Sequence, residues 1–91
     1  MLNMVTLTWD PDKRDEVLKR VQTLGFEHEG EKVAGTWVDT NGGRAFQLIE
    51  TPPDLDTRIL AKNSFAWNDL IKIESVAVIK AEEMMKLLAS M

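Results

Sequence analysis

The sequence predicts an α+β fold: a four-stranded antiparallel sheet with two helices on one face and an extra C-terminal helix. Three observations indicate this fold. The chain has four short runs of apolar and β-branched residues, an Asn-Gly turn signal between two of them, and amphipathic stretches with helical spacing. Its 91 residues are enough for one domain. A content of 44% hydrophobic and 29% charged residues is typical of a globular protein rather than a disordered or collagen-like one.

Residues 2–9 form the first apolar run, which contains no glycine or proline and reads as a strand. Asp10 is expected to cap the following helix, with Pro11 at its first position. Gly25 is a natural helix stop, so the helix is predicted over residues 11–24. Four apolar residues recur at helical spacing along this segment: Val17, Leu18, Val21 and Leu24.

A hairpin is predicted after a polar connector at residues 26–32. Two β-type runs occupy residues 33–40 and 44–51, and Asn41-Gly42 lies between them. Asn-Gly between two such runs is a strong hairpin signal, because a primed turn needs positive φ angles. The pair is therefore expected to be antiparallel.

The second helix is predicted to begin at Pro53 or Asp54, after the two prolines that break the third strand. Its end is placed between Asn63 and Asp69. Four apolar residues roughly fit its buried side: Leu55, Ile59, Leu60 and Phe65.

The last predicted elements are a strand over residues 71–79 and an amphipathic helix within residues 80–91. The order β-α-β-β-α-β corresponds to the ferredoxin-like split βαβ arrangement, since parallel crossovers are right-handed. Residues 1–79 are thus expected to form the ferredoxin-like domain, with residues 80–91 as an added helix.

Both faces of the predicted sheet carry apolar residues. In the first strand Val5 and Leu7 alternate with Met4, and in the third strand Phe46 alternates with Ala45. Two helices cover only one face, and a sheet-sized apolar patch rarely stays exposed on a monomer. We therefore expect a homodimer in which two helix-free sheet faces pack together. The alternative is that the C-terminal helix covers part of that face.

Composition narrows the classes of partner. Fifteen acidic side chains against eleven basic ones give a net charge of −4, which suits neither nucleic-acid phosphates nor an anionic membrane surface. We expect no nucleic acid and no membrane as partners. The chain has no cysteine, which removes disulfides, thiolate metal sites and cysteine nucleophiles. No apolar run approaches the roughly 20 residues of a membrane span, and no basic start of an export signal is visible, so a cytoplasmic protein is expected.

Five segments together resemble the domain of unknown function 3303 family of short microbial proteins. They are Met4 to Pro11, Asp15 to Arg20, Gly35 to Asp39, Gly42 to Glu50, and Trp67 to Leu70. The resemblance covers roughly residues 1–79, whereas the Met-rich C-terminal helix departs from the family's shorter acidic tail. It implies a dimeric α/β barrel of ferredoxin-like subunits. That wider group includes small monooxygenases, haem-degrading enzymes and isomerases, among which fold alone cannot choose.

The histidine content argues against metal and haem chemistry. His28 is the only histidine, and it lies among glutamates in the predicted connector. We interpret it as a residue of a flexible, solvated loop, because successive side chains of an extended segment point in opposite directions. A haem-degrading relative is expected to place an axial histidine on the second helix, and none is there. We therefore expect no metal and no cofactor.

Tryptophan is the most informative side chain. Trp9, Trp37 and Trp67 each lie near the end of an element, beside an aspartate. Packing in the core or in a dimer interface is the plainer interpretation, with each indole N–H finding an acceptor. The alternative is an aromatic pocket that holds a flat apolar ligand between sheet and helices.

Polar residues within the apolar strands complete the candidate site. Arg44 has a planar guanidinium suited to a carboxylate or phosphate ligand, although an ion pair with Asp39, Glu50 or a partner subunit is the plainer expectation. Thr8 and Gln47 are candidates for pocket polarity or for cross-strand hydrogen bonds. The candidate ligand-binding residues are thus Thr8, Trp37, Arg44, Gln47 and Trp67.

The predicted function is binding of a small apolar or carboxylate-bearing molecule by a homodimer. The alternative is a cofactor-independent monooxygenase or isomerase of the dimeric α/β-barrel type. No general base stands out. Glu50 is the best carboxylate candidate, because burial in an apolar strand would raise its pKa.

Overall fold

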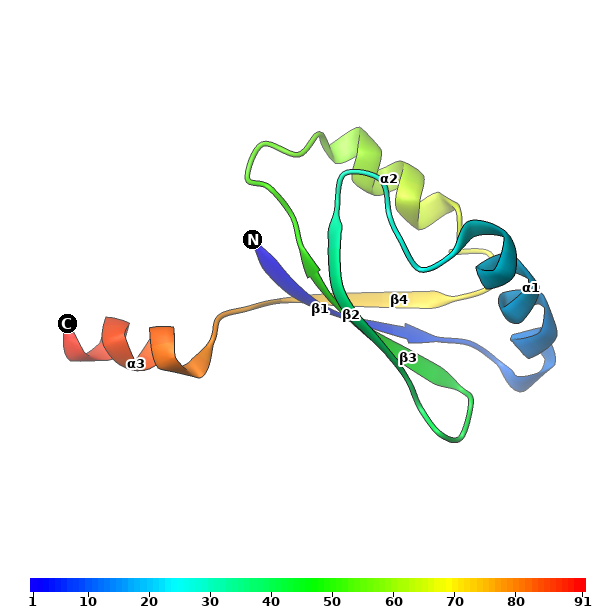
Figure 1. Ribbon diagram of the computed structural model, residues 1–91, viewed down its shortest axis with the longest axis horizontal. Coiled ribbons are helices and arrows are strands. Elements are labelled where there is room, and N and C mark those ends of the chain that lie inside the picture. The colour runs from blue at the N-terminus through cyan, green and yellow to red at the C-terminus, as the bar shows by residue number, and fades with distance from the viewer.

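The computed structural model describes all residues 1–91. It contains three α-helices and four strands, and the strands form one sheet (Figure 1). Along the chain the elements are β1 (Leu2–Thr8), a 3₁₀ turn (Pro11–Lys13), α1 (Arg14–Leu24), β2 (Lys32–Val38), β3 (Arg44–Glu50), α2 (Thr57–Phe65), β4 (Lys72–Val78) and α3 (Ala81–Ala89). Each predicted element is present, with ends that differ by a few residues.

The four strands form a single antiparallel sheet in the order β2-β3-β1-β4. The two strands that carry the crossover helices, β1 and β3, are its centre. This is the ferredoxin-like arrangement, so the predicted fold is confirmed. The sheet is twisted, and α1 and α2 lie on the same side of it (Figure 1).

The first helix begins later than predicted. Pro11–Lys13 form a 3₁₀ turn, and the α-helix starts at Arg14. The expectation that the Asp10 side chain caps this helix is wrong, because its carboxylate accepts no capping hydrogen bond. The Asp10 carbonyl instead accepts from the Lys13 N–H at 2.9 Å. Gly25 ends α1 as expected, with a φ of 74°.

The β2–β3 hairpin is confirmed, but its turn is not a primed one. Among the turn residues only Gly42 has a positive φ, 81°, whereas no residue other than glycine does anywhere in the chain. The Gly42 N–H donates to the Asp39 carbonyl at 2.8 Å, which makes an ordinary i to i+3 turn around Thr40 and Asn41. A longer loop than Asn-Gly alone therefore joins the strands.

The second helix begins at Thr57, three or four residues after the predicted start. Asp56 is its N-cap, and its carboxylate accepts from the Arg58 N–H at 2.9 Å. Because Asp56 satisfies this N–H, the segment between the prolines and Asp56 stays outside the helix. After Phe65 a tight turn leads into β4, and the Ile71 N–H donates to the Trp67 carbonyl within it.

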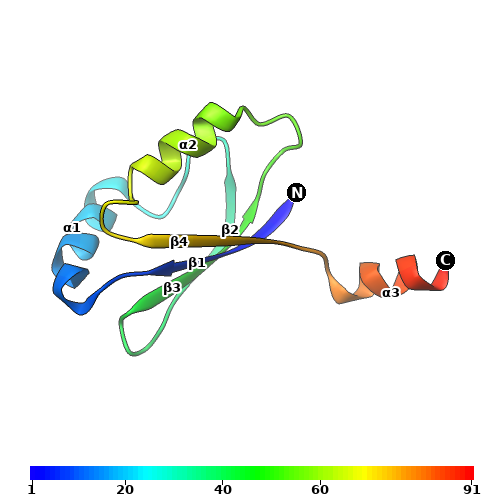
Figure 2. The same cartoon turned by 180° about the vertical axis from the view of Figure 1, so that it is seen from behind.

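The C-terminal helix does not pack on the sheet. It leaves the end of β4 and projects away from the domain, so that residues 81–91 are all exposed (Figures 1 and 2). The alternative in which this helix covers the helix-free sheet face is therefore wrong for the single chain. A two-residue link carries it outward beyond the edge of the sheet. No helix is long and apolar enough to span a bilayer.

Candidate functional site

The sheet register sorts strand residues onto two faces. Side chains alternate along a strand, and residues paired across strands lie on the same face. The face covered by α1 and α2 carries Val5 and Leu7 of β1, with Ala45, Gln47 and Ile49 of β3. Four of these five residues are buried, and Leu7 is partly buried. The opposite face, which no element covers, is called the open face below.

A cavity of about 460 Å³ lies between the covered face and the two helices. Fifteen of its 25 lining residues are hydrophobic. Both its size and its apolar lining fall in the range of small-molecule sites. A second hollow, about 820 Å³, lies between the sheet edge and the start of α3, but only four of its twelve lining residues are hydrophobic. The smaller cavity is therefore the better candidate site, because it joins apolar walls to a few polar groups.

One end of this cavity is closed by the packed core. Val17 of α1 contacts Trp67, Leu70 and Ile71, the residues of the turn between α2 and β4. Trp67 is 8% exposed, so this candidate residue is chiefly a core side chain that also lines the cavity. All four side chains are buried, which makes this end a rigid wall.

An ion pair holds α1 against the same turn. The Arg20 guanidinium donates to both oxygens of the Asp69 carboxylate, at 2.5 and 3.0 Å, and also to the Ala66 carbonyl at 3.0 Å. Its guanidinium lies 5.9 Å from the centre of the Trp67 ring. The hydrogen bonds from Arg20 lower the pKa of Asp69 below the ordinary value for an aspartate.

The other end of the cavity is polar and centres on Gln47. Its side-chain nitrogen donates to the Phe26 carbonyl and to the Thr36 hydroxyl, both at 3.1 Å. Its side-chain oxygen lies 2.9 Å from Nε2 of His28. Gln47 is 2% exposed, so these three partners satisfy a buried amide that would otherwise be costly. Gln47 is the one candidate residue that the structure places at a polar point of the cavity.

The segment Phe26–Glu31 forms the rim at this polar end, and helix α2 holds it in place. Asn63 donates to the Glu29 carbonyl and to the Glu31 carboxylate, both at 2.9 Å. Lys62 donates to the Glu29 carboxylate at 2.9 Å, and this bond raises the pKa of Lys62. The connector is solvated as expected, since Glu27 and Glu29 are exposed, but it is not a flexible one, because α2 and β3 both anchor it.

His28 is correspondingly a wall residue of the cavity and is partly buried. Its glutamate neighbours in the sequence indicated a solvated loop, so His28 was not among the predicted ligand-binding residues. Gln47 could have pointed to His28. Its amide lies in an apolar strand and needs hydrogen-bond partners there, and the only histidine of the chain can supply one.

Trp9 departs from the expectation that every indole N–H finds an acceptor. Its Nε1 is buried and has no hydrogen-bond partner. The ring lines the cavity and packs against the core cluster around Val17. Trp9 therefore contributes packing, and its indole N–H makes no hydrogen bond.

The other candidate residues lie on the open face and do not join this cavity. Thr8 pairs with Arg44 across β1 and β3, and Trp37 pairs with Phe46 across β2 and β3. Trp37 is 57% exposed. Its ring lies over Gly35, where an added Cβ would clash with the indole. The structure therefore separates Thr8, Trp37 and Arg44 from Gln47 and Trp67.

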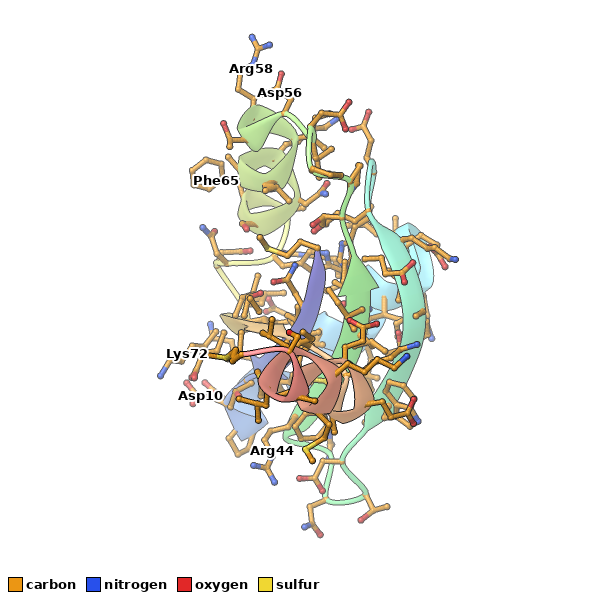
Figure 3. The ribbon with its side chains drawn as sticks, turned by 90° about the vertical axis from the view of Figure 1, so that its left-hand side faces the viewer. Asp10, Arg44, Asp56, Arg58, Phe65 and Lys72 are labelled. Carbon is orange, nitrogen blue, oxygen red and sulfur yellow. The ribbon has the colours of Figure 1, made fainter.

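Arg44 forms the ion pair expected with Asp39. Its Nε and its terminal nitrogen lie 3.2 and 3.1 Å from one Asp39 oxygen, and its guanidinium lies 5.5 Å from the Phe46 ring centre. The Asn41 backbone N–H and Arg44 both donate to Asp39 and lower the pKa of its carboxyl. Figure 3 shows Arg44 at the hairpin end of the sheet, far from α2.

Glu50 is not buried, contrary to expectation. Its side chain is 54% exposed and lies 3.6 Å from the Lys32 ammonium, on the open-face side of the β2–β3 ladder. Glu50 lines the larger polar hollow rather than the apolar cavity. No group of three or more histidine, aspartate or glutamate side chains is arranged to hold a metal ion.

Comparison with known proteins adds a family. The family model described as Domain of unknown function (DUF3303) matches residues 1–91, the whole chain. The match includes the C-terminal helix, which the sequence resemblance had left outside. No curated protein and no solved structure matches the chain.

Proposed function

The chain belongs to the DUF3303 family, whose description names no activity, and from its geometry we propose that it binds a small, mostly apolar molecule. The site is the cavity between the covered face and helices α1 and α2. The observation that supports this is a space of about 460 Å³ with mainly hydrophobic walls and one polar end. Apolar space left empty forfeits dispersion contacts on all its walls, which a bound molecule would restore.

The lining also separates the two ligand classes expected from the sequence. No lysine or arginine side chain lines the cavity, and Arg44 is paired with Asp39 on the other side of the sheet. A carboxylate inside the cavity would therefore lack a side-chain cation and would meet the Glu31 carboxylate at the rim. An uncharged apolar molecule fits this lining better than a carboxylate-bearing one.

Native mass spectrometry of protein purified gently from its host tests the binding proposal. We expect an additional mass of a few hundred daltons, which would identify the ligand. Protein carrying no added mass would then be titrated with apolar probes while backbone amide shifts are followed by NMR. Shifts confined to the open face, or no shifts at all, would contradict a ligand site in the cavity.

We also propose that the protein is a homodimer joined through the open face. Seven apolar side chains lie there: Leu2, Met4, Trp37, Phe46, Leu48, Val76 and Val78. Three of them are well exposed in the single chain, with Trp37 at 57%, Val76 at 62% and Met4 at 40%. Since α3 leaves this face uncovered, a second copy of the sheet is the occupant with the matching apolar surface. Light scattering at micromolar concentration should give twice the chain mass, and a monomer would contradict the proposal.

A second candidate is a cofactor-independent monooxygenase or isomerase acting in the same cavity. The observation that favours it is the His28 imidazole in the cavity wall, since histidine is the side chain that most often transfers protons in catalysis. If the ligand found by mass spectrometry is a substrate, incubation in air should change its mass or its isomer composition. The Glu50→Gln variant should react equally fast, since Glu50 lies outside the cavity. An unchanged ligand would leave binding as the function.

A further inference from the structure

The Gln47 amide at the polar end of the cavity has one possible orientation. The Phe26 carbonyl can only accept a hydrogen bond, so the group facing it must be the amide NH₂. The second N–H then donates to the Thr36 hydroxyl. The Gln47 carbonyl oxygen is therefore the atom that faces His28, and it can only accept.

This orientation fixes the tautomer of His28. Nε2 lies 2.9 Å from an oxygen that only accepts, so Nε2 must carry the hydrogen. In the neutral imidazole Nδ1 is then an unprotonated acceptor. No residue of the protein donates to Nδ1. Nδ1 is also accessible. Only one side-chain nitrogen or oxygen is both fully buried and without a partner, and that atom is Trp9 Nε1.

The other side chains tied to the rim segment Phe26–Glu31 are likewise short of donors. Both N–H groups of Gln47 and both N–H groups of Asn63 are already used. The side-chain sites that remain are acceptors, namely His28 Nδ1, the Asn63 oxygen and the Glu31 carboxylate, with the Thr36 hydroxyl as the one remaining side-chain donor. These side chains therefore recognise a ligand by what it donates.

We propose that the ligand carries a hydroxyl group, as a phenol, an enol or an alcohol, on an otherwise apolar body, and that this hydroxyl donates to Nδ1 of His28. The assignment rests on the proposed binding function and names the ligand class for the same cavity. The apolar body lies against the hydrophobic walls, and Gln47 acts as a positioning residue that keeps Nδ1 free to accept. A carboxylate or phosphate is disfavoured because it brings negative charge beside the Glu31 carboxylate and offers no donor to His28 Nδ1.

The first test reads the tautomer directly. His28 is the only histidine, so ¹⁵N-labelled protein gives one pair of imidazole nitrogen signals. In long-range ¹H–¹⁵N spectra recorded over a pH series, the neutral ring should show Nε2 as the protonated nitrogen and Nδ1 as the unprotonated one. A neutral ring protonated at Nδ1 would overturn the proposal.

The second test uses a matched pair of probes, 2-naphthol and 2-methoxynaphthalene, which share an apolar body but differ in the donor. Calorimetric titration should show 2-naphthol binding about three- to tenfold more tightly, the factor expected for one net hydrogen bond. The Nδ1 signal should shift on adding 2-naphthol and stay in place with the methyl ether. In His28→Phe the preference should disappear, while Glu50→Gln, changed outside the cavity, should keep it.

The outcomes separate this proposal from the one it rests on. Equal binding of both probes to the unaltered protein, with amide shifts around the cavity, would overturn the hydroxyl assignment and keep the cavity as a binding site. No binding of either probe, in a protein that also carries no ligand from its host, would contradict both. A preference that survives in His28→Phe would place the hydroxyl elsewhere and overturn the role of His28.

Discussion

The two faces of the sheet are both apolar in sequence but differ in what the fold does with them. On the covered face, Val5, Ala45 and Ile49 are at most 7% exposed, and the polar Gln47 has three hydrogen-bond partners. On the open face, Trp37 remains 57% exposed. Alternation along a strand reveals that both faces are apolar, but it does not say which one the helices cover. The covered face therefore holds the packed core, and the proposals above place ligand binding on that face and assembly on the open one.

The largest expected effect is in the core on the covered side of the sheet, where Trp67→Ala should lower the free energy of unfolding by about 3–5 kcal/mol. Trp67 is 8% exposed and packs with Val17, Leu70 and Ile71, so its removal leaves a hole in the core. Urea unfolding followed by circular dichroism, at several protein concentrations, measures the change. Trp37→Ala is the matched control and should lower the stability of the isolated chain by about 1 kcal/mol or less. Equal losses for the two variants at the lowest concentration would contradict the distinction between the faces.

The next effect concerns assembly through the open face. Trp37→Glu should weaken the homodimer by about 2 kcal/mol or more, roughly thirtyfold in its dissociation constant, because a symmetric interface brings two such carboxylates together. Sedimentation velocity over a concentration series measures this. Phe65 is the matched control, since it is an even more exposed aromatic, at 72%, that projects outward from α2 (Figure 3). Phe65→Glu should leave the dimer intact. If Phe65→Glu gave a monomer and Trp37→Glu did not, the interface would involve α2 instead of the open face.

A smaller effect is expected at the polar end of the cavity. Gln47→Met keeps the side-chain length but leaves the Phe26 carbonyl and the His28 Nε2–H without partners, which should cost about 1–3 kcal/mol of stability. Thr36→Val removes only one of the three Gln47 partners and should cost less, about 1 kcal/mol. Thermal unfolding of both variants provides the comparison. A Gln47→Met protein as stable as the unaltered one would mean that the amide is not the hub of this network.

The smallest effect is a pH dependence from the Arg20–Asp69 pair. Hydrogen bonds from Arg20 lower the pKa of Asp69 in the folded chain, so the pair stabilises the fold above the ordinary aspartate pKa of about 3.9. This stabilisation is lost as the pH falls through the lowered folded-state pKa. The melting temperature of Asp69→Asn should therefore lie below that of the unaltered protein at pH 7, and the difference should shrink below about pH 4. Arg20→Gln should show the same narrowing, whereas a constant difference at all pH values would exclude this linkage.

The sequence predicted the fold well because its signals are local. Gly25 ends α1, Asn41 and Gly42 lie in the hairpin turn, and the four strands fall within about two residues of their predicted ends. The errors concern helix starts. Asp10 was expected to cap the first helix and does not, and the second helix was expected to begin at Pro53 or Asp54, whereas Asp56 caps it and it begins at Thr57. Several aspartates close together compete for such a role, and the path of the chain selects one of them.

The candidate site was predicted only in part. Gln47 and Trp67 were identified and both line the cavity, whereas Trp37 and Arg44 belong to the other face. His28 was missed because its contact with Gln47 spans 19 residues of sequence and two elements. Contacts of that kind depend on how the rim segment crosses over the sheet, and no local pattern encodes that path.

The sequence by itself determined the strands, the helices, their order and the apolar character of both sheet faces, because periodicity and turn chemistry act over a few residues. Only the tertiary structure decided which face α1 and α2 cover and that α3 stands clear of the sheet. It also decided that His28 meets Gln47 at the edge of an apolar cavity. These properties depend on how the elements pack together, and packing joins residues that are distant in the chain.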